Sequence, residues 1–171
     1  VILGVQSRNV GVMIKHFALN NRETNRKNCD SVCSEKAIRE IYLKGFEMAV
    51  KNANPWSVMS SYNKINGVYS SENRELLTDI LRTEWGFEGF VSTDWENLAA
   101  KGLEIQAGND ISMPVGDEAS LVAAYSLGLV QKQALYTAAE RILRTVLKST
   151  AMEHLVNPPC EIIPADGSAL R

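Results

Sequence analysis

The chain has 171 residues, of which 45% are hydrophobic and 22% are charged, and its formal net charge is −2. These values are ordinary for a globular protein with one sizeable core, and they leave no basic surface of the kind that binds nucleic acid. No apolar stretch reaches 18 residues. We therefore expect neither nucleic acid nor a membrane as a partner.

The first predicted unit is a strand followed by a helix. The apolar run "VGVMI" at 10–14 predicts a strand that ends at Lys15 and His16. A polar loop follows, and then a helix is expected from about 35 to 52. Its apolar residues recur at helical spacing: Ile38, Ile41, Tyr42, Phe46 and Ala49.

The second unit repeats this order. The run "SVMSS" at 57–61 predicts a strand that ends at Tyr62, and "NG" at 66–67 is a turn signal. Leucine and isoleucine on one face predict a helix at about 73–85. The stretch "FVS" at 90–92 then predicts a third buried strand.

The remainder of the chain continues the alternation. We expect a short helix near 97–107 and a fourth short strand that ends in "DISMP" at 110–114. A long helical segment follows at 117–149, and Gly128 divides it into two helices.

Alternating strands and helices predict an α/β fold with parallel strands and right-handed crossovers. A doubly wound sheet and a (β/α)₈ barrel both fit this order, but no strand leads into a glycine-rich phosphate loop. A full barrel typically takes roughly 250 residues. Because the chain has about four βα units, we predict the C-terminal half of a (β/α)₈ TIM-like barrel.

Polar residues follow three of the predicted strands: Lys15 and His16, then Tyr62, then Asp94 and Trp95. Taken singly, such an aspartate is usually a helix N-cap, and a single histidine or tryptophan is usually structural. Together they predict a pocket, because the carboxyl ends of parallel strands meet on one face of a barrel. Donors, an indole face and a carboxylate suit a neutral polyhydroxylated ligand.

The cysteines Cys29, Cys33 and Cys160 make no disulfide framework. No second pair of cysteines or histidines lies near Cys29 and Cys33, so we interpret them as plain thiols. We expect no metal and no cofactor.

Several motifs together resemble glycoside hydrolase family 3, most closely its β-glucosidase branch. They are "KHFALNNRETNR" at 15–26, the long stretch at 34–95 that ends in "FVSTDW", and "AAERILR" at 138–144. The resemblance covers residues 4 to 150. It implies that 1–150 form part of the family's N-terminal barrel domain, with 151–171 a linker or the start of the next domain.

The resemblance also implies roles. The family uses a retaining mechanism, and its nucleophile falls on Asp94, with Thr93 in place of the usual serine. The paired residues that hydrogen-bond sugar hydroxyls fall on Lys15 and His16. Three further positions line the sugar site or flank the neighbouring one: Met59, Tyr62 and Trp95. Glu23 and Arg26 are typical of the family and are interpreted as structural.

Two parts of such an enzyme are missing from the chain. The acid/base glutamate of this branch lies on a separate α/β sandwich domain, and the first half of the barrel also supplies sugar contacts. We therefore expect a small β-glucoside or short oligosaccharide as substrate, the sandwich domain as a partner, and no activity for the isolated chain. "KHFALNN" departs from the "KHFPGHG"-like text of the β-N-acetylglucosaminidase branch, which disfavours that branch.

Two other functions remain open at this stage. Lys15 at a strand end could form a Schiff base with a carbonyl substrate, as in an aldolase. The chain could also be part of a sugar-binding barrel without catalytic activity, although such a protein would not require Asp94.

Overall fold

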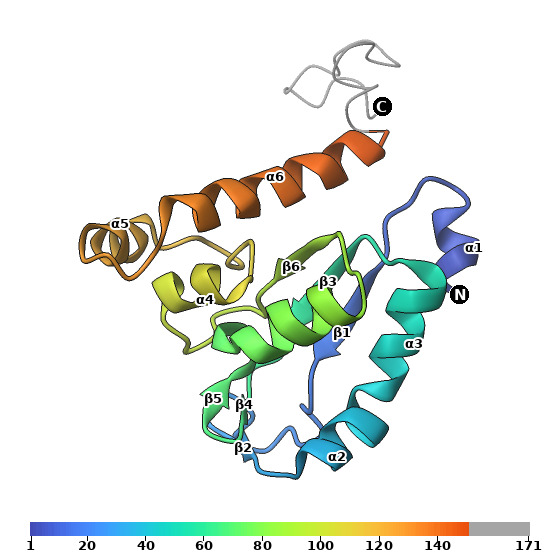
Figure 1. Cartoon of the computed structure of the whole chain (residues 1–171), viewed down its shortest axis with the longest axis horizontal. Helices are drawn as coiled ribbons and strands as arrows, with labels where there is room; N and C mark the ends of the chain where they lie inside the picture. Colours follow the sequence, from blue (N-terminus) through green and yellow to red (C-terminus); the bar gives the residue numbers. More distant parts are fainter. Residues whose placement is uncertain (151–171) are drawn as a thin grey trace, which may run out of the picture.

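The computed structural model describes residues 1–150; the predicted linker at 151–171 lies outside the described residues. It is an α/β fold built on a parallel sheet in the order β1-β3-β6 (Figure 1). The strands are β1 (Met13–Phe17), β3 (Ser57–Ser60) and β6 (Phe90–Ser92). A single parallel bridge between Ser92 and Ile111 adds a fourth strand position beside β6. Three of the four predicted strands and their parallel arrangement are therefore confirmed, and the fourth is present only as this bridge.

The helices follow the predicted order, and the break near Gly128 is confirmed. Their bounds are α1 (Ile2–Gln6), α2 (Glu35–Ala37), η1 (Ile38–Tyr42), α3 (Lys44–Ala53), η2 (Ser70–Glu72), η3 (Glu75–Glu84), α4 (Lys101–Ala107), α5 (Glu118–Ser126) and α6 (Lys132–Lys148). The expected start of α4 at residue 97 is wrong. The Asn97 side chain accepts a hydrogen bond from the Ala99 N–H at 3.1 Å, a local turn that competes with helix.

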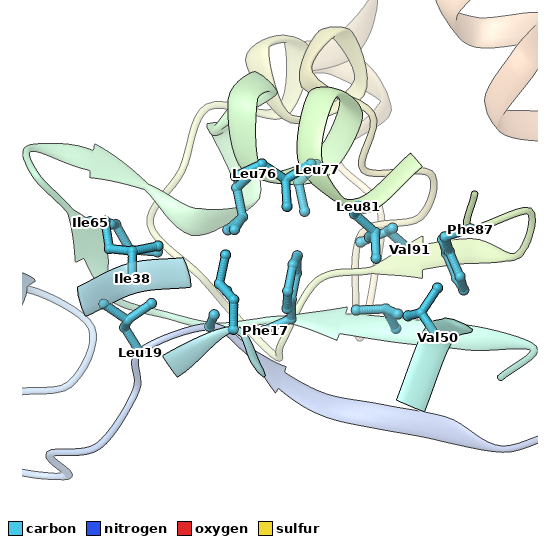
Figure 2. Close-up of a cluster of buried hydrophobic side chains, with 14 of the residues drawn as sticks. Phe17, Leu19, Ile38, Val50, Ile65, Leu76, Leu77, Leu81, Phe87 and Val91 are labelled. Atoms are coloured by element: carbon cyan, nitrogen blue, oxygen red, sulfur yellow. The ribbon is translucent and has the colours of Figure 1, made fainter. Parts of the chain in front are cut away.

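The hydrophobic core lies between the sheet and the helices on one of its faces. Figure 2 shows Leu77 and Leu81 of η3 opposite Phe17 and Val91 of the sheet. All four side chains are fully buried. Each buried aliphatic or aromatic side chain stabilises a fold by about 1.5–3 kcal/mol, so this layer holds the strands in place.

A second, small sheet was not predicted. β2 (Asp30–Ser31) pairs in parallel with β4 (Lys64–Ile65), which forms a hairpin with β5 (Val68–Tyr69). The turn signal at Asn66 and Gly67 is confirmed, because both residues have positive φ angles, 49° and 91°, as this tight hairpin turn requires. Two-residue strands are too short to show a periodic pattern in the sequence.

The first strand is shifted from its predicted position at 10–14, so that Lys15 and His16 lie within β1. Ile14 pairs with Val58 and Phe17 pairs with Ser60, which leaves one extra residue on β1. This is a β-bulge. Ile14 and Phe17 both pack into the core, and between them the His16 side chain reaches the Asp94 carboxylate at the end of β6.

A buried ion cluster fastens the helices to the opposite, N-terminal ends of the strands. The Asp110 carboxylate accepts hydrogen bonds from Arg82 of η3 at 2.6 Å, Arg141 of α6 at 3.0 Å and the Val91 N–H at 2.7 Å. Burial raises the pKa of Asp110 and lowers the pKa of Arg82 to about 10, so Arg82 is still a cation at neutral pH. In a fold of this kind, such a cluster at the N-terminal ends serves stability.

Among residues 1–150, no helix has the length and apolar character needed to cross a membrane.

Candidate active site

The loop after β6 carries Asp94, and Thr93 fixes its course. The Thr93 N–H donates to the carbonyl of Ile111 at 2.9 Å, and the Thr93 hydroxyl accepts from the Met113 N–H at 2.9 Å. The Thr93 side chain is fully buried. A hydroxyl is therefore needed at this position, because an aliphatic side chain would leave the Met113 N–H without its acceptor.

The Asp94 carboxylate lies against His16. Asp94 Oδ2 is 3.5 Å from His16 Nε2, and this is an ion pair when the imidazole is protonated. The other oxygen, Asp94 Oδ1, accepts the Trp95 N–H at 2.7 Å. Two predicted residues from strands that are not neighbours in the sheet are thus brought together.

Tyr62, which follows β3, completes this group. Its side chain is buried, and burial is the main reason why its pKa is raised above the usual value. The negative charge of Asp94 and a hydrogen bond with that carboxylate raise it further. The phenol therefore stays protonated at neutral pH and is available as a hydrogen-bond donor beside the carboxylate.

The structure puts the other three predicted site residues in less enclosed positions. Lys15 is exposed, and the described residues show no ion pair between Lys15 and Asp94. Met59 is half-buried and pairs with Ser92 across β3 and β6. The Trp95 side chain is 58% exposed, so its indole lies at the rim of the group and not within it.

Two basic residues that the sequence did not assign to the site lie on the Tyr62 ring. The Arg26 guanidinium is 4.7 Å and the Lys27 ammonium 5.3 Å from the centre of the Tyr62 ring. Arg26 also pairs with Glu23 at 2.8 Å, in keeping with its structural interpretation. The basic residues of this loop are visible in the sequence. Because the backbone of the loop is irregular, however, the sequence does not indicate that these residues contact Tyr62.

A cavity of about 580 Å³ lies close by, between α4, α5 and residues 109–114. It contains Glu104, whose side chain is 2% exposed and whose carboxylate lies 3.3 Å from Lys101 Nζ and 3.2 Å from the Ser112 hydroxyl. We place the candidate site at Asp94 instead, because there an acid, an imidazole and a phenol from three different elements meet. In residues 1–150, no three histidine, cysteine or acidic side chains are clustered as a metal site would require.

A parallel α/β sheet that gathers such groups at the carboxyl ends of its strands is typical of α/β enzyme domains. The chain belongs to glycoside hydrolase family 3: residues 1–145 match the model described as "Glycosyl hydrolase family 3 N terminal domain". The predicted family resemblance is confirmed.

Curated relatives agree with this assignment. The thermostable beta-glucosidase B of Acetivibrio thermocellus is 45% identical over 148 residues, which cover 85% of this chain and 20% of the relative. The exo-alpha-(1->6)-L-arabinopyranosidase of Bifidobacterium longum is 43% identical over 158 residues, covering 92% of this chain and 21% of the relative. Nothing in these comparisons supports a Schiff-base lyase that uses Lys15.

Solved structures agree as well. The beta-glucosidase 3B of Thermotoga neapolitana, solved in complex with glucose, matches with a TM-score of 0.85 and 44% identity. The match covers 90% of this chain and 23% of that protein. The chain therefore spans about a fifth of the length of the curated relatives that it matches.

Proposed function

We propose that this chain carries the nucleophile of a retaining glycosidase that removes terminal β-D-glucosyl residues. The observation that supports this most is the contact between Asp94 and His16 at the ends of parallel strands, in a chain of family 3. The Asp94 carboxylate would attack the anomeric carbon and form a covalent glycosyl-enzyme, which water then hydrolyses.

The remaining site residues would bind and orient the sugar. His16 lies beside Asp94 and can donate a hydrogen bond to a sugar hydroxyl, and the oxygen of Tyr62, whose proton is directed to Asp94, can accept one. Lys15 precedes His16 on β1, and Met59 lies on the strand between β1 and β6. The exposed indole of Trp95 would offer a flat apolar surface next to the site.

A retaining mechanism needs a second carboxyl group, about 5–5.5 Å from the first, to protonate the leaving oxygen. Three glutamates in the loops and helix around the site each have a basic partner: Glu23 pairs with Arg26, Glu96 with Lys27, and Glu104 is buried beside Lys101. This supports an acid/base residue outside the chain, on an α/β sandwich domain of the same polypeptide.

We also propose that the described residues form half of a barrel. The four parallel strand positions, with helices over the face that forms the core, would be the C-terminal half of a (β/α)₈ barrel. Residues 1–150 would then be part of the barrel domain, and 151–171 a linker or the start of the next domain. The rest of the barrel would supply further contacts to the sugar.

The test is a hybrid enzyme in which residues 1–150 replace the matching segment of the Acetivibrio thermocellus relative. We expect the hybrid to hydrolyse an aryl β-glucoside, and Asp94→Ala to abolish turnover without loss of the folded state seen by circular dichroism. Hydrolysis by the Asp94→Ala hybrid at a near-normal rate would remove Asp94 from the role of nucleophile.

A further inference from the structure

An ion pair joins the loops after β1 and β6 over the end of the strand between them. Lys27 Nζ lies 3.5 Å from Glu96 Oε2, with Lys27 in the loop after β1 and Glu96 in the loop after β6. The sheet order β1-β3-β6 puts Tyr62, which follows β3, beneath this bridge. The pair therefore spans the edge of the candidate site.

The Glu96 backbone is held without help from Lys27. Its N–H donates to the carbonyl of Met113 at 3.2 Å, and its φ angle of 54° is in the left-handed region. Thr93 holds the same loop through Ile111 and Met113. Because these backbone contacts already fix Asp94, the Lys27–Glu96 pair is not needed to aim the nucleophile.

The pair instead lies at the rim, beside the exposed indole of Trp95. The Glu96 side chain is 77% exposed and that of Asp94 only 12%, while Lys27 and His16, at 34% and 32%, lie between these two depths. If the sugar that is cleaved is terminal, as proposed above, it fills the inner group of His16, Tyr62 and Asp94. Only the leaving group then extends to the rim.

We propose that Lys27 and Glu96 bind the leaving group and favour one that is itself a sugar. The ammonium donates hydrogen bonds, the carboxylate accepts them, and the neighbouring indole provides a flat apolar face. Hydroxyl groups of a second sugar can form hydrogen bonds with both the ammonium and the carboxylate. An apolar aryl group would exclude water from these two charged groups without replacing the hydrogen bonds that they make to water. This inference rests on the proposed function and names its leaving group.

The hybrid enzyme tests the inference with two substrates, a β-linked glucose disaccharide and phenyl β-glucoside, whose ring has no polar substituent. A hydrogen bond to a charged group is worth about one power of ten in binding. We therefore expect Lys27→Met to raise the ratio of the disaccharide KM to the aryl KM about tenfold, with little change in the ratio of the two kcat values. Lys27→Arg keeps the charge and should restore the KM ratio.

A double-mutant comparison identifies the pair as one unit. Glu96→Gln should raise the KM ratio in the same direction, and Lys27→Met with Glu96→Gln should do no more than the larger single change. The matched control is Arg144→Met, because Arg144 pairs with Glu140 at 2.7 Å on the exposed surface of α6, and it should leave the KM ratio as it is. Equal KM increases for both substrates in Lys27→Met would overturn the inference.

A binding measurement separates this inference from the proposed function. Calorimetry gives the Kd of the disaccharide for the Asp94→Asn hybrid, which requires no turnover. A Kd about tenfold weaker after adding Lys27→Met supports recognition by Lys27 even if Asp94 proves not to be the nucleophile. An unchanged Kd overturns the inference even if Asp94 is the nucleophile.

Discussion

His16 Nε2 lies 3.5 Å from Asp94 Oδ2, and this contact joins β1 to the loop after β6 across the end of β3. The Lys27–Glu96 pair spans the same strand end. Both contacts depend on the loops at the carboxyl ends of the parallel strands. The candidate site therefore lies at one end of the sheet, and the buried Asp110 cluster lies away from it.

Thr93 provides a test of how Asp94, the proposed nucleophile, is held. Thr93→Val removes the acceptor of the Met113 N–H and should lower kcat of the hybrid about 10- to 100-fold, because a small misplacement of a reacting group is costly. Thr93→Ser keeps the hydroxyl and should stay within about threefold of the unmodified hybrid, since the same hydrogen bond can form. Equal kcat values for the valine and serine variants would contradict this role.

The titration of the Tyr62 phenol tests whether Asp94 lies beside it, and this test needs no substrate. The raised pKa means that the phenol ionises above pH 10 in the folded protein, so the free energy of unfolding should fall as the pH rises past 10. Asp94→Asn removes one cause of the shift and should move the titration of Tyr62 to lower pH, while burial keeps it raised. The ultraviolet difference between the hybrid and its Tyr62→Phe variant measures this. An unmoved titration in Asp94→Asn would show that the two groups do not interact.

The buried Asp110 cluster predicts a large loss of stability on substitution. Asp110→Asn leaves Arg82, whose side chain is 7% exposed, without its counter-charge, and such changes typically cost about 3–5 kcal/mol. Glu140→Gln, in the exposed pair with Arg144, is the control and should cost less than about 0.5 kcal/mol. Urea unfolding of the 171-residue chain, followed by circular dichroism, compares them. Similar midpoints for the two variants would contradict the role of the cluster.

The isolated chain should show negligible β-glucosidase activity. General acid catalysis contributes roughly 10²- to 10⁴-fold, and the proposed acid lies outside the chain. Half a barrel would also have two unpaired edge strands, which favours association. The assay uses an activated aryl glucoside, because a good leaving group depends least on the missing acid. Turnover near that of the hybrid would mean that the acid is in the chain, and Glu23, Glu96 and Glu104 would be the first residues to substitute.

The sequence predicted the strands and helices that have a regular apolar period, and it identified Asp94, His16 and Tyr62. It could not predict the bulge in β1, because an extra residue is visible only against the partner strand. The approach of Lys27 to Tyr62 and Glu96 depends on the path of an irregular loop, which no periodic pattern records. Asp94, His16 and Tyr62 could be grouped because each follows or ends a regular strand, whereas Lys27 and Glu96 lie in irregular loops and could not.

The most direct test of the central claim is to trap the glycosyl-enzyme of the hybrid. An activated 2-deoxy-2-fluoro-β-glucoside slows both steps of a retaining mechanism but keeps a good leaving group, so the covalent intermediate accumulates. Mass spectrometry of a protease digest should find the fluoroglucosyl group on the peptide that contains Asp94, and Asp94→Asn should abolish the label. Inactivation with the label on another carboxylate, such as Glu96 or Glu104, would contradict the assignment of Asp94 as the nucleophile.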